Sequence, residues 1–376
     1  MRVTSRIKSL LLLAAALFAA CVPSASATVT YYVGKCAGSP HYKTISAALA
    51  ATPAPDVVEV CPGPYPEQIV ITKAVTLEGI FTANADQVFI TVPTGGFTTN
   101  GPADCLNVQV CVDSAIGTVN ISNITVDGHG NGVLEGNPVV GILYFDSSGT
   151  ADHIETRFQE GTLNGMGVEV NGNANSVTIK NSNLHGFDGV GIFAIDNSDF
   201  GNQLTVSIER NTVVANPGAQ SGIETEAGAS VSVTGNVVSG PGVPAGSSCT
   251  ISSCIGMSIE QAAVGSISNN TIVGSAEVGI QLVAGVAGST MSVTSNTILD
   301  ISGDGIEILY KTGGPLQSNI IVQARNGIDF VCNAVNNVSS NSISAIHSLG
   351  LANVPSGLNS PNTYYNVPTL YSSSGC

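Results

Sequence analysis

The sequence predicts an all-β fold, a single-stranded right-handed parallel β-helix (a solenoid) with a short N-terminal capping helix. Three observations predict it: repeats of 22 to 34 residues, short segments of alternating hydrophobicity within them, and Gly, Asn and Ser turns too short for crossover helices. A coil of that length can wrap once around a narrow core, so that each strand pairs with its equivalent one coil further along.

The first 27 residues are typical of a secretory signal. Three basic residues precede an apolar run from Leu10 to Ala20, and small residues end at Ala27. We expect cleavage after Ala27 and a secreted or periplasmic protein. Cys21 offers an alternative, lipoprotein processing, which would leave the protein lipid-anchored. No later stretch reaches the roughly 18 apolar residues that a transmembrane helix requires, so we expect no transmembrane segment.

The remainder divides into three parts. Residues 28–118 are expected to form an N-terminal cap and the first coils, residues 119–349 the repeat coils, and residues 350–376 a non-repeating C-terminal cap. Within the first part, Thr44 is expected to begin a short helix whose apolar side covers the open first coil. The segment from Pro93 to Gly117 is interpreted as an excursion held by a disulfide.

Eight segments begin with Gly and continue as an alternating strand. They start at Gly141, Gly167, Gly191, Gly222, Gly256, Gly279, Gly305 and Gly327, with separations of 26, 24, 31, 34, 23, 26 and 22 residues. Because side chains alternate along a strand, the first and third residues after each Gly are expected to point into the core. The second and fourth residues are then expected to point outward.

A second motif, a short β-branched strand that closes on Asn, runs in phase with the first. The closing residues are Asn181, Asn211, Asn236, Asn270, Asn296, Asn319 and Asn341. We therefore expect two strands and a turn in each repeat, with the Asn side chains stacked and hydrogen bonded from coil to coil. The alternative is a polar ligand groove formed by outward-facing Asn.

Cysteine usage suits an oxidising compartment. Either processing route leaves eight of the nine cysteines, and proximity in the sequence suggests local pairs. These pairs are Cys36 with Cys61, Cys105 with Cys111, Cys249 with Cys254, and Cys332 with Cys376. A zinc site is the rival interpretation, but the chain has no CxxC pair.

The chain is strongly acidic. Its formal net charge is −15, and removal of the basic signal would make it more negative. Nucleic acid and anionic membranes would be repelled, so neither is expected as a partner. An anionic polysaccharide would need a divalent cation as a bridge. Nothing in the sequence predicts an oligomeric state.

The segment from Tyr32 to Gly79 resembles a known superfamily. Its stretches KTISAALAA, DVVEVCPGPYPEQIVITK and AVTLEG are similar to the N-terminal segment shared by pectinesterases and bacterial β-helix repeat proteins, within the pectin-lyase-like superfamily. The resemblance implies a right-handed β-helix over nearly all of the mature chain, but no particular activity. The paired catalytic Asp motifs of pectinesterases have no counterpart. Gly128-His129-Gly130 matches only one motif of polygalacturonases, and we interpret it as a turn.

Candidate functional residues lie in the outward positions of the repeat. The second position after each Gly reads Leu143, Glu169, Phe193, Glu224, Ser258, Gln281, Glu307 and Asp329. Equivalent residues of neighbouring coils lie about 5 Å apart, so Glu307 and Asp329 should be side by side, and Glu226 and Glu260 at the fourth position likewise.

Paired carboxylates repel each other, which raises one pKa or recruits a cation such as Ca²⁺. We therefore predict a calcium site at Glu307 and Asp329. The candidates for catalysis are Glu224, Glu226, Glu260, Glu307 and Asp329, with Lys311 as a proton-transfer partner. The alternative is that this acidic column is the solvated face of the sheet.

Outward apolar residues would form an exposed patch unless something covers them. The patch is expected from Leu143, Phe145, Phe193 and Ile195, and the insertion at residues 147–164 is expected to fold over it. A contact with a partner is the alternative.

Three functions remain open. The first is an exported β-helix protein associated with polysaccharide, by binding or by lyase or glycoside hydrolase activity. The second is a non-catalytic extracellular scaffold or adhesion-like surface protein, favoured by the regular, disulfide-pinned solenoid. The third resembles the periplasmic β-helix proteins of copper-enzyme maturation, against which stand only four Met and no clustered His.

Overall fold

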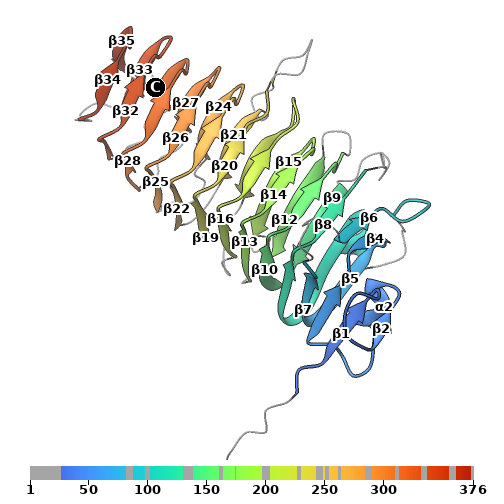
Figure 1. Cartoon of the computed structure of the whole chain (residues 1–376). Helices are drawn as coiled ribbons and strands as arrows, with labels where there is room; N and C mark the ends of the chain where they lie inside the picture. Colours follow the sequence, from blue (N-terminus) through green and yellow to red (C-terminus); the bar gives the residue numbers. More distant parts are fainter. Residues whose placement is uncertain are drawn as a thin grey trace, which may run out of the picture.

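The computed structural model describes most of the chain, and its strands stack into one elongated body (Figure 1). The described residues are 27–81, 88–97, 102–129, 139–160, 164–173, 175–196, 204–226, 230–242, 249, 254–260, 264–283, 290–309, 313–331, 337–354 and 361–373. The expected signal at residues 1–27 therefore lies outside them, apart from its last residue. So do Cys332 and Cys376, Lys311 and the lipidation candidate Cys21.

Each repeat contains three strands rather than the expected two. In one coil these are β12 (Gly165–Gly172), β13 (Ser176–Lys180) and β14 (Asn183–His185). Every strand pairs in parallel with its equivalent in the next coil, which produces three columns of strands. The third strand was missed because it is only three residues long, too short to show alternation.

The three columns run the length of the molecule. The first column contains β9 (Val139–Phe145), β12, β15 (Val190–Asp196), β18 (Ser221–Glu226), β21 (Ile255–Glu260), β24 (Val278–Val283), β27 (Asp304–Ile308), β30 (Asn326–Phe330), β33 (Leu349–Val354) and β35 (Thr369–Ser373). The second contains β10 (Ser148–Asp152), β13, β16 (Thr205–Glu209), β19 (Ser230–Thr234), β22 (Val264–Ser268), β25 (Thr290–Thr294), β28 (Leu316–Gln317) and β31 (Val338–Ser339). The third contains β4 (Gly63–Pro66), β6 (Val88–Thr91), β8 (Thr125–Asp127), β11 (Glu155–Arg157), β14, β17 (Thr212–Val214), β20 (Val237–Ser239), β23 (Thr271–Val273), β26 (Thr297–Leu299), β29 (Ile320–Val322), β32 (Ser342–Ser344) and β34 (Thr363–Tyr365).

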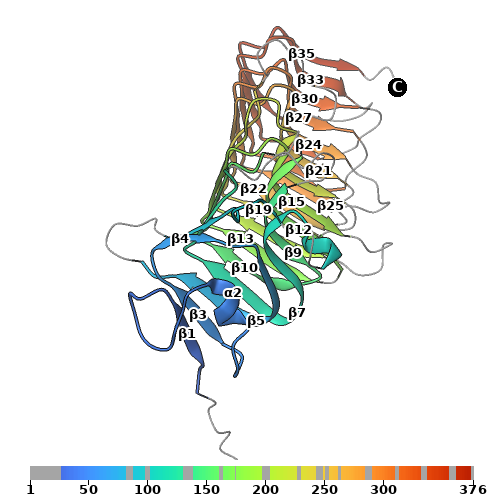
Figure 2. The same cartoon turned by 90° about the vertical axis from the view of Figure 1, so that its right-hand side faces the viewer.

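The N-terminal coils join the first two columns into one sheet. Strands β5 (Ile69–Gly79) and β7 (Val108–Ser122) are long enough to run through both columns and pair with each other. Strands β1 (Thr30–Val33), β2 (His41–Tyr42) and β3 (Val57–Val60) extend the same sheet toward the N-terminal end. Figure 2 shows the coils stacked from β1 at one end to β35 at the other.

The core follows the predicted alternation. In the first column, the residues one and three positions after each Gly are buried, which confirms the inward positions. The third-position residues are Tyr144, Val170, Ala194, Thr225, Ile259, Leu282, Ile308 and Phe330. The apolar core is continuous from Tyr31 to Leu351, so one solenoid core supports the whole described body.

The recurring glycines have a steric cause. A Cβ placed on Gly191 would lie 2.5 Å from the carbonyl oxygen of Gly222, and one on Gly279 would lie 2.6 Å from that of Gly305. Each Gly of the column is thus packed against the backbone of the Gly in the next coil. Any side chain here would push neighbouring coils apart, which explains why the repeat begins with Gly.

Stacked Asn side chains form the predicted ladder inside the turn between the second and third columns. Asn211 donates from Nδ2 to Oδ1 of Asn236 over 3.0 Å, and the pattern continues coil by coil as far as Asn362. Each Nδ2 also donates to a backbone carbonyl of the preceding coil, as Asn236 does to Ile208 over 2.9 Å. The ladder is therefore structural, and the alternative of an outward Asn groove is wrong.

One member of the predicted ladder is wrong. Asn181 has a positive φ of 51°, and its Nδ2 donates to Oδ1 of Asp152 over 2.8 Å. Ser182 occupies the ladder position, because its backbone N–H donates to Oδ1 of Asn211. The pattern was read one residue early, since each turn from Ser182 to Asn341 places a left-handed residue directly before the ladder position.

The N-terminal end contains a short helix, α2 (Ile45–Leu49), whose N-cap is Thr44. The Thr44 hydroxyl accepts from the backbone N–H of Ala47, and the carboxylate of Glu67 accepts from the N–H groups of Ile45 and Ser46. The helix buries Ile45 and Ala48 in the core. Its role as the cap of the first coil stays a prediction.

Two expected irregular segments turn out to be regular. Strand β7 begins at Val108, and Val110 and Val112 join the core, so the excursion expected up to Gly117 ends much earlier. Its described part includes a 3₁₀ turn, η1 (Ala103–Cys105). Residues 350–376 were expected not to repeat, yet β34 and β35 continue the third and first columns.

The prediction that residues 147–164 form an insertion over the outward patch is also wrong. These residues contain β10 and β11 of a normal coil. Their sequence lacks the β-branched run and the closing Asn that mark other coils. Leu143 of the outward patch is instead covered by Cys105 and Val108, beside η1.

Three of the predicted disulfides form: Cys36 with Cys61, Cys105 with Cys111, and Cys249 with Cys254. The fourth predicted pair lies outside the described residues. Within the described ranges, no helix combines the length and apolarity needed to span a bilayer. Disulfides suit a protein of an oxidising, extracellular environment.

Candidate functional site

The outward positions of the first column form one continuous row, which we call the outer row. Consecutive members are register partners from Leu143 of β9 to Asp329 of β30. Its members are Leu143, Glu169, Phe193, Glu224, Ser258, Gln281, Glu307 and Asp329. The predicted stacking of Glu307 on Asp329 is thus confirmed, and polar and acidic residues occupy its C-terminal half.

Contrary to the alternative of a solvated face, much of this row is buried. Glu224 is 2% exposed, Ser258 2% and Gln281 5%. Outward-pointing side chains of neighbouring coils pack on one another closely enough to remove water from these carboxyl and amide groups. The pKa of a carboxyl changes most when the group is removed from water, because burial disfavours its charged form.

Glu224 is the centre of the first acidic group. The Ser221 hydroxyl and the Gln220 amide both donate to its carboxylate. Burial raises the pKa of Glu224 to about 7, and the negative charges of Glu260 and Glu226 add to the rise, while the Ser221 hydrogen bond opposes it. Glu224 is therefore a carboxyl group that can hold a proton near neutral pH.

Glu260 belongs to the same group. Burial raises its pKa, and the nearby charge of Glu226 acts in the same direction. The Ser258 hydroxyl lies 3.2 Å from Oε1 of Glu260, within donating distance. The sequence had placed Glu226 and Glu260 together, and the structure shows that Glu224 joins them.

The Ser258 hydroxyl and the Gln281 amide lie between this first acidic group and a second one. Ser258 Oγ also lies 3.3 Å from Oε1 of Gln281, so its one proton can be donated either to Glu260 or to Gln281. Gln281 Nε2 donates to Oε2 of Glu307 over 2.7 Å. Burial raises the pKa of Glu307, and the charges of Asp304 and Asp329 raise it further. Hydrogen-bonding contacts thus connect three consecutive members of the outer row, Ser258, Gln281 and Glu307.

The second acidic group contains Asp304, Glu307 and Asp329. Asp304 accepts from Nη2 of Arg325 over 2.9 Å and from Nδ2 of Asn326 over 2.8 Å. Asp329 accepts from Asn353 over 2.7 Å, and burial raises its pKa. Sequence reasoning missed Asp304. The available signal was its place at the start of a strand where the two preceding coils have Val278 and Ile255.

The predicted calcium site remains untested by this geometry. Glu307 and Asp329 are neighbours, but each carboxylate already accepts from an amide, of Gln281 and Asn353. Among the described residues, no three His, Cys, Asp or Glu side chains are grouped so as to hold a metal ion. Lys311, the predicted proton-transfer partner, lies outside the described residues.

The N-terminal half of the row borders a cavity of about 300 Å³. Its lining includes Leu106, Leu143, Phe145, Glu169 and Asn171. Burial raises the pKa of Glu169, which accepts from Nδ2 of Asn171 over 3.0 Å. A hollow lined by both polar and apolar side chains thus lies beside Glu169, which Phe193 separates from Glu224 in the outer row.

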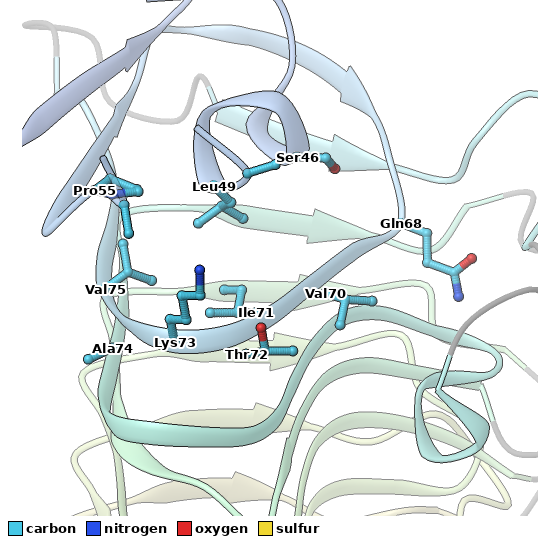
Figure 3. A pocket seen from close by; sticks show the side chains of 12 residues that line it. Ser46, Leu49, Pro55, Gln68, Val70, Ile71, Thr72, Lys73, Ala74 and Val75 are labelled. Carbon is cyan, nitrogen blue, oxygen red and sulfur yellow. The ribbon is translucent and has the colours of Figure 1, made fainter. Parts of the chain in front are cut away.

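A second cavity, of about 360 Å³, lies at the N-terminal end between α2 and β5 (Figure 3). Leu49, Pro55, Val70 and Val75 supply apolar surface, and Lys73 points into the space from β5. The lining contains no carboxylate and no member of the outer row. The cavity is therefore separate from the acidic site.

The family model for a right handed beta helix region matches residues 166–343. A comparison with curated proteins gave no match.

Solved structures share the fold across nearly the whole chain. The mannuronan C-5 epimerase AlgE4 A-module of Azotobacter vinelandii has a TM-score of 0.58 and 17% identity, covering 88% of this chain and 91% of the other. The catalytic domain of a GH87 alpha-1,3-glucanase, in complex with tetrasaccharides, has a TM-score of 0.60 and 14% identity, with coverage of 93% and 67%. PfbA, a surface adhesin of Streptococcus pneumoniae, has a TM-score of 0.56 and 14% identity, with 83% of each chain covered. At these identities, the likeness shows the fold alone.

These matches confirm the resemblance that the N-terminal segment indicated. Two of the similar structures are enzymes that act on polysaccharide and one is an adhesin, so the fold is compatible with both expected classes of function. The chain thus matches the model of a right-handed β-helix region at residues 166–343 and shares the overall fold of these parallel β-helix structures.

Proposed function

We propose that the chain is an exported polysaccharide-binding protein whose outer row is the glycan site, and that Glu224 acts there as a general acid on a glycosidic bond. The observation that carries the proposal is the Glu224 carboxyl, buried among other carboxylates with a pKa of about 7. A group with that pKa holds a proton at neutral pH far more often than an ordinary Glu, and its donation to a leaving oxygen requires that glycan binding make this side chain, 2% exposed, accessible.

The surrounding residues support hydrolysis better than elimination. A general acid needs a second carboxylate to stabilise positive charge on the sugar or to activate water, and Glu260 and Glu226 lie beside Glu224. A lyase acting on a uronate needs a cation to neutralise the substrate carboxylate. Arg325, the cation next to the second acidic group, is already paired with Asp304. The net charge of −15 also disfavours a uronate polymer.

The line of hydrogen-bonding groups suits an extended ligand. Ser258 and Gln281 lie between Glu224 and Glu307 in the row, and Asn353 binds Asp329 at its end, so amide and hydroxyl groups accompany the carboxylates toward which a sugar would lie. The hollow beside Leu143 and Phe145 provides apolar surface at one end. A glycan lying along the stack would contact both.

The test is incubation of the mature protein with a panel of neutral and uronic polysaccharides, with products identified by mass spectrometry. We expect shortened products from a neutral glycan, and a rate about 100-fold or more lower for Glu224→Gln. Glu209→Gln is the matched control, because Glu209 lies on the second column and binds Ser207 and Arg210. A full rate in Glu224→Gln would contradict the assigned role. Binding without products would favour the non-catalytic scaffold.

A further inference from the structure

A charged and aromatic cluster lies on the third column, on a sheet that the outer row does not use. On the outward positions of this column, charged and imidazole side chains occur at three consecutive strands, β8, β11 and β14. They are Asp127, Glu155, Arg157 and His185. From β17 to β32 the corresponding described positions hold neutral residues, namely Thr212, Val214, Val237, Ser239, Thr271, Val273, Thr297, Leu299, Ile320, Val322, Ser342 and Ser344. This sheet therefore forms without charged side chains at the equivalent positions of later coils, so the charges on β8, β11 and β14 require a separate explanation.

Arg157 is held in a fixed orientation. Its Nε and Nη2 both donate to Oδ2 of Asp127, over 3.0 and 2.8 Å. The guanidinium lies 5.3 Å from the ring centre of Phe89 and 5.8 Å from that of Phe158. Its Nη1 lies 3.7 Å from Glu155. A side chain that normally moves freely is thus immobilised with part of its donor edge at the surface.

Glu155 and His185 form the other half of the cluster. Nε2 of His185 lies 2.7 Å from Oε1 of Glu155, and the Thr125 hydroxyl donates to Oε2 over 3.2 Å. Asp127 accepts from the backbone N–H of His129 over 2.9 Å. Hydrogen bonds therefore hold the side chains of Asp127, Glu155, Arg157 and His185 in place.

Phe158 is the centre of the cluster. Its backbone is left-handed, with φ at 55°, which is rare for a bulky residue, and its side chain is 37% exposed. At the same point of other coils stand Gly186, Gly274, Asp300, Gln323, Ala345 and Asn366. A Cβ on Gly186 would lie 3.1 Å from Cδ1 of Phe158, so the glycine leaves room for the ring.

Two imidazoles flank this ring. The centres of His129 and His185 lie 5.6 and 6.0 Å from that of Phe158, nearly perpendicular to it. The ion pairs of the cluster are partly buried, with 14% to 30% of each side chain exposed, and they can stabilise the coils. A left-handed Phe is unfavourable, so the packing of the coil gives no reason to place a bulky aromatic side chain at this position.

We propose that this platform, formed by Phe158 with His129, His185, Arg157, Glu155 and Asp127, is a second binding site for a neutral saccharide. The exposed part of the Phe158 ring stacks on the apolar face of a sugar ring, while the fixed guanidinium, imidazole and carboxylate groups exchange hydrogen bonds with its hydroxyls. Two carboxylates against one guanidinium disfavour an anionic sugar. The site is non-catalytic and does not depend on the function proposed for the outer row.

The test uses NMR of the mature protein, with the imidazole C–H signals of His129 and His185 as reporters. The probes are cellotetraose, maltotetraose, laminaritetraose and nigerotetraose, with trigalacturonate as the anionic comparison. We expect at least one neutral tetrasaccharide to shift both signals saturably, while His41 and His347 stay unchanged and trigalacturonate has no effect.

Three variants make the test specific. Phe158→Ala and Phe158→Leu are expected to weaken the affinity roughly tenfold or more. Tyr365→Ala is the matched control, because Tyr365 is an exposed aromatic at the far end of the same column, and it should bind as the native chain does. Glu224→Gln should also bind normally, which separates this site from the outer row. Unshifted His129 and His185 signals with every neutral probe, or unchanged affinity in both Phe158 variants, would overturn the proposal.

Discussion

Gln281 donates from Nε2 to Oε2 of Glu307 over 2.7 Å, and this bond connects the two acidic groups of the outer row. On its other side, Oε1 of Gln281 lies 3.3 Å from the Ser258 hydroxyl, which also lies 3.2 Å from Oε1 of Glu260. The carboxyl groups of Glu260 and Glu307, two coils apart, are thus connected through one amide and one hydroxyl.

Glu224 should make the protein less stable as the pH rises. The pKa of Glu224 is about 7 when folded, against 4.5 for an ordinary Glu, so the folded protein binds a proton that the unfolded chain releases. Its stabilising contribution is complete below pH 4.5 and is lost as the pH rises through 7. The shift corresponds to about 3 kcal/mol.

Thermal unfolding followed by circular dichroism at pH 5 and pH 8 checks this. The native midpoint should fall between the two values by clearly more than that of Glu224→Gln, and Glu209→Gln should follow the native protein. Equal pH dependence in the native chain and Glu224→Gln would contradict the assigned environment.

The glycine column should tolerate no side chain. Gly279→Ala places a Cβ 2.6 Å from the Gly305 carbonyl oxygen and 2.7 Å from Ile298, so we expect destabilisation of about 2 kcal/mol or more. Gly242→Ala is the control, because its Cβ would meet no atom within 4 Å. Urea unfolding measures the free energy of unfolding of both variants. Equal values would contradict the predicted clash between neighbouring coils at Gly279.

The asparagine ladder should act as a cooperative unit. Asn270→Ala removes the acceptor of the Asn236 side chain and backbone N–H, and the donor to the Val233 carbonyl. Buried polar groups without partners cost about 1 to 3 kcal/mol each. Asn181→Ala, in the same kind of turn but outside the ladder, should cost much less. A urea midpoint for Asn270→Ala no lower than that for Asn181→Ala would contradict the ladder's role.

Calcium binding at Glu307 and Asp329 is a separate prediction. Two adjacent carboxylates should attract Ca²⁺ once it competes with the amides of Gln281 and Asn353. We expect millimolar Ca²⁺ to raise the unfolding midpoint of the native protein but not that of the double variant Glu307→Gln, Asp329→Asn. A similar rise in both proteins would place the ion elsewhere, and no rise in either would leave the two carboxylates without a metal.

Much of the fold was predictable because its causes are local. The Gly and Asn positions recur at every coil, and each has a cause in the backbone of the adjacent coil. The third strand and the coil of β10 and β11 were missed because they carry no periodic signal of their own. Asn181 was misassigned because a left-handed residue and a ladder residue follow each other in each turn.

The site was predictable only in outline. The register of the repeat indicated that Glu307 meets Asp329, and that prediction is confirmed. It did not indicate that Glu224 is buried, because this depends on Ser221, Gln220 and the neighbouring coils together. The platform around Phe158 was missed, since its residues come from three coils whose third strands were not recognised.

The most direct test of the central claim is a carbon-13 NMR titration of the Glu224 side-chain carboxyl between pH 4 and pH 9, with the signal assigned by Glu224→Gln. We predict a midpoint near 7, shifted further upward in Ser221→Ala, because that variant loses the hydrogen bond that favours the charged form. A midpoint near 4.5 would show a solvated carboxylate, and Glu224 could not then serve as the proton donor of the outer row.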